Sequence, residues 1–458
     1  MKVLRTGFKF PLIFLLAILM WITVNCFDAD LDRGPKQHVY VEEVEETDNG
    51  YQYLSFLNDN DYSLISDESI REKLLNIVEG KEWDSKFIEK LLEDKKEALS
   101  ALELAILKPK FQPPISEDPL EMLPFTGIID LNRLVLSASV LNSKNGDFIN
   151  AIEYLNKSIL FSQSIKNTPD TNLISYFISS RMEHEAISVI HRLVNMKGID
   201  SKVLAKISLV LQSIPDYRQS SFSDVFYGEF RFGYKLAALP FTRSLKERLA
   251  EYHITKGADV YDSEFNARGK NTTEKTYELL QAMIPWYFIH PNETANALFS
   301  KYDTYAKEAH KYCNEVNVSS IDEQFVPDFW DLISPNSLGK GWESTDTNLK
   351  GYYIRNCHAH MYIESVRAII AIKRFEALNR RLPDSLQELV PGFLDTVPVD
   401  PFDGSSLRYS KENRWVYSVG INFRDDGGSS QGEYNFYCGH NDVCSTNQTV
   451  FFMLSTKY

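Results

Sequence analysis

The sequence predicts an α+β protein that is mainly α-helical, with a small α+β module near its C-terminal end and one apolar helix at its N-terminus. Apolar residues between 66 and 312 recur with the period of an amphipathic helix. Two short runs rich in aromatic and β-branched residues, 407–409 and 415–420, are typical of strands. A single long apolar run, 11–24, follows a basic start.

Length and charge limit the classes of function. A chain of 458 residues is long enough for two or three domains. Its 63 acidic residues exceed its 49 basic ones and give a net charge of -14. A charge of this sign repels phosphates, so we expect no nucleic-acid partner.

The N-terminal segment predicts the compartment. Lys2, Arg5 and Lys9 precede the apolar run 11–24, an arrangement typical of a signal peptide or an uncleaved signal anchor over residues 1–27. A lipoprotein cysteine at Cys26 and a buried core helix are the alternatives. Because the basic head stays in the cytoplasm, we expect a single-pass inner-membrane protein with its bulk in the periplasm or outside, or a secreted one if the signal is cleaved.

The segment 28–62 is strongly acidic and has few apolar residues. It holds ten acidic and two basic side chains. Such a composition predicts a solvated linker between the membrane and the first folded domain.

Residues 63–345 are expected to form an all-α domain. Ser69 to Glu72 has the pattern of a capping box, and Gly80 should end that helix. Asp84 is expected to cap the next helix, which continues to Ile106. Further helices are predicted over 171–196, 201–213, 216–238, 242–257 and 273–312.

One helical hairpin stands out within this domain. Leu134, Ala138 and Leu141 share one helix face, Asn145-Gly146-Asp147 forms a turn, and Ala151 to Ile159 provide the returning face. The pair resembles a tetratricopeptide-type helix pair, although no second copy follows at a spacing of 34 residues. We therefore expect repeat-like helical hairpins.

Four cysteines follow Cys26. Cys438 and Cys444 bracket a short loop with turn-forming residues, which favours a disulfide between them and leaves Cys313 and Cys357 as the second pair. Four buried free thiols are the alternative.

The region 346–458 carries a specific series of motifs. A helix over 355–382 is followed by Leu382-Pro383-Asp384-Ser385-Leu386, by Pro398-Val399-Asp400-Pro401-Phe402, and by a strand pair ending at Tyr417-Ser418-Val419-Gly420. An acidic, glycine-ended loop comes next. Over residues 355–430 this order resembles the globular domain of the major pseudopilins of type II secretion.

The resemblance implies a calcium site, because the corresponding loop of that family binds calcium. Position by position it implicates Asn422, Asp425 and Asp426, with Glu433 as a further candidate ligand. Calcium takes six to eight oxygen ligands, which such side chains supply. The alternative is a solvated turn without metal.

These observations predict a membrane-anchored, non-enzymatic scaffold that binds other proteins of a bacterial cell envelope. The pseudopilin resemblance implies that its partners belong to a type II secretion or pilus-like system. The alternative is an exported hydrolase whose site lies in the helical domain. Its conceivable polar groups are Glu183, His184, Glu229 and Arg231. His184 and His191 are seven residues apart, too far along one helix to share a zinc ion.

Overall fold

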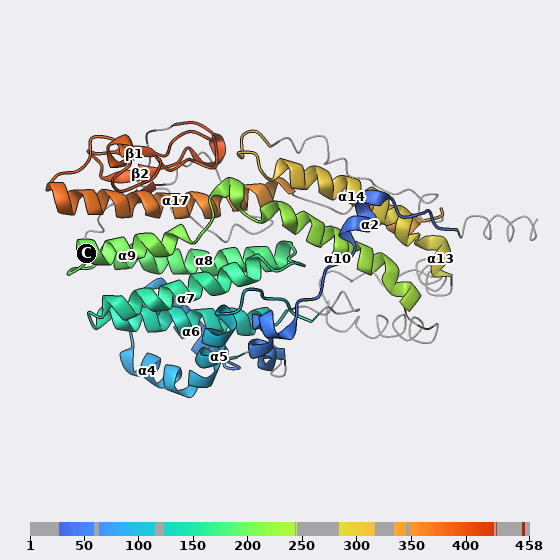
Figure 1. Cartoon of the computed structure of the whole chain (residues 1–458), viewed down its shortest axis with the longest axis horizontal. Helices are drawn as coiled ribbons and strands as arrows, with labels where there is room; N and C mark the ends of the chain where they lie inside the picture. Colours follow the sequence, from blue (N-terminus) through green and yellow to red (C-terminus); the bar gives the residue numbers. More distant parts are fainter. Residues whose placement is uncertain are drawn as a thin grey trace, which may run out of the picture.

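The computed structural model describes residues 27–58, 64–114, 123–242, 244, 284–316, 334–344, 349–425 and 427, and the backbone of 451–453. These residues contain 13 α-helices and a small antiparallel sheet, so the predicted mainly helical fold is confirmed. Figure 1 shows the helices stacked in layers, with the sheet on the outer side of the longest helix.

The predicted inner-membrane location is contradicted. Among the helices of the described residues, none combines the length and the apolar character that a membrane crossing requires. The longest, α17 (Leu349–Asn379), has 31 residues but carries charged side chains throughout, among them Arg355, Glu364 and Arg374. The run 11–24, on which the prediction rested, lies outside the described residues.

The acidic segment is not the solvated linker that its composition predicts. Its second half forms a 3₁₀ helix, η2 (Gly50–Asn58), whose Tyr51, Leu54 and Leu57 are buried against α5. Its first half includes the short helix α2 (Arg33–His38) and lies along two later helices, α10 (Phe222–Thr242) and α14 (Pro291–Glu308). A few apolar residues therefore fix this stretch despite its charge.

The first helices start and stop close to where the sequence predicts. Helix α3 (Glu68–Glu79) ends at Gly80 in the left-handed conformation, as expected. Its N-cap, however, is Asp67, whose carboxylate accepts a hydrogen bond from the Ser69 N–H. Asp84 caps the next helix as predicted, but this helix is divided at Lys95 into α4 (Ser85–Asp94) and α5 (Lys96–Ile106).

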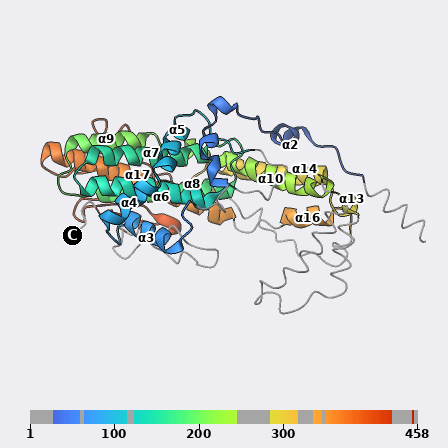
Figure 2. The same cartoon turned by 90° about the horizontal axis from the view of Figure 1, so that it is seen from below.

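Four helices form the central layers. The predicted hairpin is present as α6 (Phe125–Lys144) and α7 (Phe148–Lys166), joined by a turn in which Gly146 has a φ of +80° and Asp147 caps α7. Helix α8 (Leu173–Leu193) packs on α7, and α9 (Ser201–Gln212) packs on α7 and on α17. Figure 2 shows these helices from a second direction.

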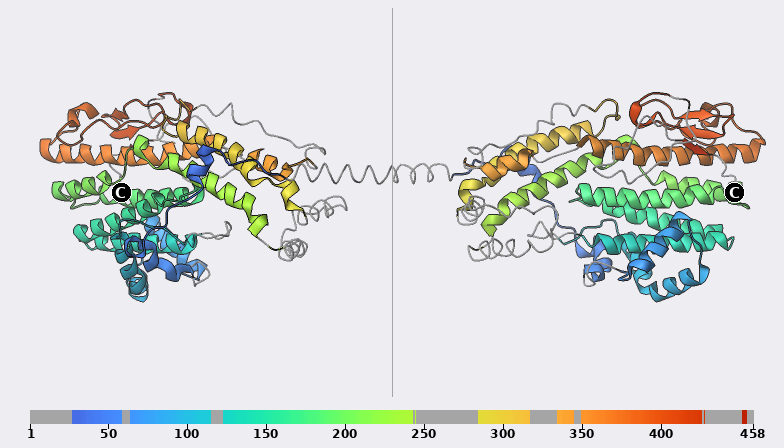
Figure 3. Two further views of the ribbon diagram at one scale, coloured as in Figure 1. Left: turned by 45° about the vertical axis from the view of Figure 1, so that its right-hand side comes forward. Right: turned by 180° about the vertical axis from the view of Figure 1, so that it is seen from behind.

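A separate pair of helices extends the molecule at one end. Helix α10 (Phe222–Thr242) follows the 3₁₀ turn η3 (Tyr217–Gln219) and packs along α14 (Pro291–Glu308). The short helices α13 (Pro285–Phe288) and α16 (Ser337–Ser344) lie at the same end. Figure 3 shows that α10 and α14 reach beyond the central layers. We call α10 and α14 the arm.

The C-terminal module is built on α17. After the 3₁₀ turn η5 (Leu386–Leu389), strands β1 (Arg408–Ser410) and β2 (Trp415–Tyr417) pair antiparallel, with Tyr409 opposite Val416. The 3₁₀ turn η6 (Gly420–Asn422) follows, and β3 (Phe451–Met453) pairs with β2. One apolar core runs from the layers through α17 into the module; it includes Ile187, Ile207, Ile369, Phe402 and Val416. The domain boundary at 345/346 stays a prediction.

Candidate functional site

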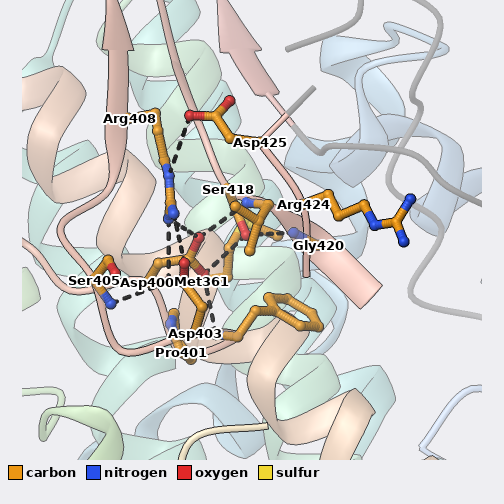
Figure 4. Close-up of polar contacts among 12 residues, drawn as sticks. Met361, Asp400, Pro401, Asp403, Ser405, Arg408, Ser418, Gly420, Arg424 and Asp425 are labelled. Atoms are coloured by element: carbon orange, nitrogen blue, oxygen red, sulfur yellow. Dashed lines mark hydrogen bonds and ion pairs between the residues drawn. The ribbon is translucent and has the colours of Figure 1, made fainter. Parts of the chain in front are cut away.

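Three aspartates of the module, Asp400, Asp403 and Asp425, lie around Arg408 of β1 (Figure 4). Asp400 is fully buried, and its carboxylate accepts hydrogen bonds from the N–H groups of Phe402 and Val419, both at 3.0 Å, and from Ser418 Oγ at 2.9 Å. Burial raises the pKa of Asp400, while these donors act in the opposite direction. Asp400 therefore ties the loop before β1 to the end of β2.

Arg408 of β1 supplies the positive charge of this cluster. Its guanidinium lies 2.8 Å from Asp400 Oδ2 and 2.5 Å from Asp403 Oδ2, and its Nε lies 3.8 Å from Asp425 Oδ2. Burial alone would raise the pKa of Asp403, but hydrogen bonds from Arg408 and from the Ser405 N–H outweigh it and lower that pKa. Three carboxylates thus gather around one internal cation.

The structure describes two of the four predicted calcium ligands. Asn422 Oδ1 accepts a hydrogen bond from the Arg424 N–H at 3.0 Å, and Asp425 Oδ1 accepts one from the Gly427 N–H at 3.0 Å. Both side chains therefore already make the turn contacts of the non-metal alternative. Asp426 and Glu433 lie outside the described residues, so the calcium site stays a prediction.

Within the part of the chain that the structure describes, no group of three or more histidine, cysteine, aspartate or glutamate side chains could hold a metal ion. Asp400, Asp403 and Asp425 lie around a common point, but the Arg408 guanidinium occupies the position between them. The three carboxylates are therefore arranged around the Arg408 guanidinium as their cation, which leaves the place of a calcium ion among them taken.

The predicted disulfide Cys313–Cys357 is confirmed, and it lies where the arm, α17 and the module meet. The two Cα atoms are 6.5 Å apart. Next to it the Cys313 N–H donates to the Pro401 carbonyl at 3.0 Å, and the Asn314 N–H donates to the Phe402 carbonyl at 2.9 Å. The bond thus fixes the end of α14 to α17 beside the Asp400 loop. Cys438 and Cys444 lie outside the described residues.

A second polar cluster lies inside the helical layers. Lys166 of α7 and Glu183 of α8 are buried and form an ion pair at 2.5 Å, and Gln163 also donates to Glu183. The Lys166 ammonium lies 4.7 Å from the ring centre of Tyr176. Tyr176 in turn donates its hydroxyl hydrogen to Asn356 Oδ1 of α17 at 2.8 Å. This network links α7, α8 and α17.

His360, one helical turn after Asn356, lies close to this network and is also fully buried. Burial, and to a lesser degree the charges of Lys166 and Arg367, lower its pKa well below the usual value. Sequence patterns did not identify Lys166, Tyr176 or Asn356, whereas His358 and His360 beside Cys357 were considered there only as metal ligands. The available signal for the first of these was a polar residue on an otherwise apolar helix face, at Lys166.

The four side chains considered for a hydrolase each have a partner in the structure. Glu183 pairs with Lys166, Glu229 accepts from the Leu173 N–H at 2.7 Å, and Arg231 pairs with Asp170 at 2.6 Å. His184 stacks near Tyr362, with ring centres 4.6 Å apart, and burial lowers its pKa to about 4. Each of the four therefore already makes a contact of its own, with a different partner.

The N-terminal part of the acidic segment is bound along the arm. Asp28 accepts hydrogen bonds from the N–H groups of Asn292 and Glu293, at 2.7 and 3.0 Å, in the first turn of α14. The Asn296 side chain donates to the Asp30 carbonyl at 3.0 Å and accepts from the Asp32 N–H at 2.9 Å. The arm thus holds an extended piece of chain through its backbone.

Comparison with known proteins adds no assignment to these sites, because no protein-family model, curated protein or solved structure matches the chain. The resemblance of residues 355–430 to the pseudopilins accordingly rests on the motifs quoted above.

Proposed function

We propose that this protein is a non-enzymatic scaffold that binds other proteins, and that the arm is its principal binding element. The observation that carries the proposal is the segment 28–39 lying along α10 and α14, since it demonstrates contacts of the kind that peptide recognition uses. Stacked helical hairpins also present extended surfaces suited to protein binding.

The module supports an assembly role of the kind that its resemblance implies. Helix α17, the η5 turn and the β1–β2 pair follow one another in the order quoted for the pseudopilin domain. On this basis the proposed partners are components of a type II secretion or pilus-like machine. The hydrolase alternative receives no support from the positions of Glu183, His184, Glu229 and Arg231.

Site-specific photo-cross-linking tests the scaffold proposal. A photoreactive residue is placed at exposed Ser300 on α14, and in a matched control at exposed Glu89 on α4. In cells that naturally make the protein, we expect Ser300 to yield a discrete adduct that Glu89 does not yield. Mass spectrometry then identifies the partner, and secretion or pilus components would support the assembly role. The same adducts from both positions, or none from Ser300, would contradict the proposal.

A further inference from the structure

The contact between residues 28–39 and the arm combines backbone recognition with a few side-chain requirements. Asn292 and Asn296 lie four positions apart on α14, so both side chains are on the same helix face. The Asn292 amide donates to the Ala29 carbonyl at 2.9 Å, and the Asn296 amide donates to the Asp30 carbonyl. Two adjacent peptide units are therefore held whatever their side chains.

Asp28 adds a requirement for negative charge at the start of the segment. Helix α14 lacks a side-chain cap of its own, because His290 at the N-cap position makes no capping hydrogen bond. The two oxygens of Asp28 satisfy the N–H groups of Asn292 and Glu293 instead. Exposed N–H groups and the helix dipole both favour an acidic side chain here.

The far end of the segment adds shape requirements. A Cβ atom built on Gly34 would lie 2.7 Å from Phe299 of α14, so a larger residue does not fit there. Four residues later, the His38 ring stacks on Tyr227 of α10 with centres 4.4 Å apart. Three residues before Gly34, Leu31 packs on the apolar cluster of the arm.

The segment is held to the arm almost entirely from one side. Of residues 27–40 only Pro35 is buried, and Asp28, Ala29, Asp30 and Asp32 are exposed. Residues 40–45 then continue without helix or strand to η1 (Glu46–Asp48). A ligand that lies on the surface and is joined to the body through an extended connection can exchange with a competing one.

We propose that the arm is a peptide-binding surface occupied in the free chain by residues 28–39, and that its ligand in trans is a partner's segment of the same chemistry, extended at its start and helical at its end as α2 is. That segment carries an aspartate, an aliphatic residue three positions later, a glycine six positions later and a histidine or aromatic ring ten positions later. This inference rests on the proposed function and specifies the binding element and the class of partner.

The test uses the full-length chain and a fluorescent peptide with the sequence of residues 27–40. The variant Asp28→Ala, Leu31→Ala weakens the internal segment and leaves the arm unchanged. Fluorescence anisotropy is expected to show at least tenfold tighter peptide binding to this variant than to the wild type, in which the tethered segment competes at high effective concentration. Adding Asn292→Ala and Asn296→Ala should reverse the gain.

A control peptide carries Gly34→Val and should bind at least tenfold more weakly, because its side chain meets Phe299. The circular dichroism spectrum and melting temperature establish that each variant is folded. A folded Asp28→Ala, Leu31→Ala variant that does not bind the peptide would overturn the proposal, as would equal binding after the two asparagines are removed. A dimer that exchanges residues 28–39 would also overturn it, because the occupant would then be a second copy.

If the variant does not fold, a protease site inserted between Tyr40 and Val41 in the wild-type chain allows cleavage after folding. Retention of the cleaved segment during gel filtration, and its replacement by the fluorescent peptide, would support the proposal. Loss of the segment without rebinding of the peptide would contradict it. Photo-cross-links from Ser300 to another protein could persist in that case, so the proposed function and this inference can fail separately.

Discussion

Buried charge is compensated differently in the helical layers and in the C-terminal module. In the layers opposite charges pair across neighbouring helices, as Lys166 does with Glu183 and Arg133 with Glu185. In the module one guanidinium serves several carboxylates, and backbone N–H groups stabilise Asp400 as well. Glu185 also has Arg181 at 3.4 Å, but Glu183 has Lys166 as its cation. Loss of Lys166 therefore leaves a whole buried charge unpaired in the layers, whereas the module keeps part of its compensation.

The largest effect is expected from breaking the Lys166–Glu183 pair. Lys166→Met leaves the Glu183 carboxylate buried next to Gln163, without a cation. Unpairing a buried charge costs about 3–5 kcal/mol, which urea denaturation would detect as a loss of unfolding free energy. The matched control, Lys166→Met with Glu183→Gln, removes both charges and should regain most of the loss. A double variant no more stable than the single one would refute one-to-one compensation.

The next largest effect concerns the joint between the two regions. The double variant Cys313→Ala, Cys357→Ala removes the link between the end of α14 and α17. A closed loop of this size stabilises a protein by roughly 4 kcal/mol in the chain-entropy estimate, so we expect a loss of about 3–4 kcal/mol. Reduction should destabilise the wild type by this amount more than the variant, because the predicted Cys438–Cys444 bond is reduced in both proteins. A smaller loss would indicate that the apolar core alone holds the module to the layers.

Replacing Arg408 tests how buried charge is compensated in the C-terminal module. Arg408→Gln removes the shared cation, but Asp400 keeps its hydrogen bonds from Phe402, Ser418 and Val419. The expected loss is therefore only about 2 kcal/mol, within the range for a charged hydrogen bond. Exposed Arg424→Gln, on the adjoining loop, is the matched control and should change stability little.

Adding calcium to the wild type and to Arg408→Gln tests which cation stabilises the carboxylate cluster. If Arg408 is the cation of the cluster, millimolar calcium should leave the melting temperature of the wild type unchanged and raise that of Arg408→Gln, whose carboxylates then lack a counter-ion. If instead the loop with Asn422 and Asp425 binds calcium, the wild type itself should be stabilised. The thermal shift thus distinguishes an arginine-held from a calcium-held module.

Local sequence signals predicted the elements that local interactions determine. The α6–α7 hairpin follows from helical periodicity and from Gly146 and Asp147 at its turn, and the Cys313–Cys357 pair follows from cysteine placement. The contacts of Lys166 and Glu183 were not predictable, because they depend on how two helices align in space. Likewise, the acidic composition of 28–39 indicated a solvated linker. Composition cannot reveal that the side chains of Asn292 and Asn296, far away in the sequence, bind the backbone of this segment.

The smallest effect is expected at Asp130, the buried carboxylate of α6 that forms no ion pair with any residue the structure describes. Its Oδ2 accepts from the Ile65 N–H at 3.2 Å. Burial raises its pKa to about 6, although hydrogen bonding and the charges of Arg71 and Arg133 oppose the shift. An unfolded aspartate ionises near pH 3.9, so between about pH 4 and 6 the folded state binds the extra proton. The contribution of Asp130 to stability therefore falls as the pH rises through this window.

Asp130→Asn keeps an oxygen acceptor for the Ile65 N–H and removes the cost of burying a charge. We expect this variant to be about 1–2 kcal/mol more stable than the wild type at pH 8, and the gain to vanish below pH 4, where the wild-type carboxyl is protonated in both states. Exposed Asp94→Asn is the control and should not show this profile. A loss of stability at pH 8 would mean that the buried Arg133 depends on the Asp130 charge as well as on Glu185, and the cost of burying Asp130 would then be offset by that contact.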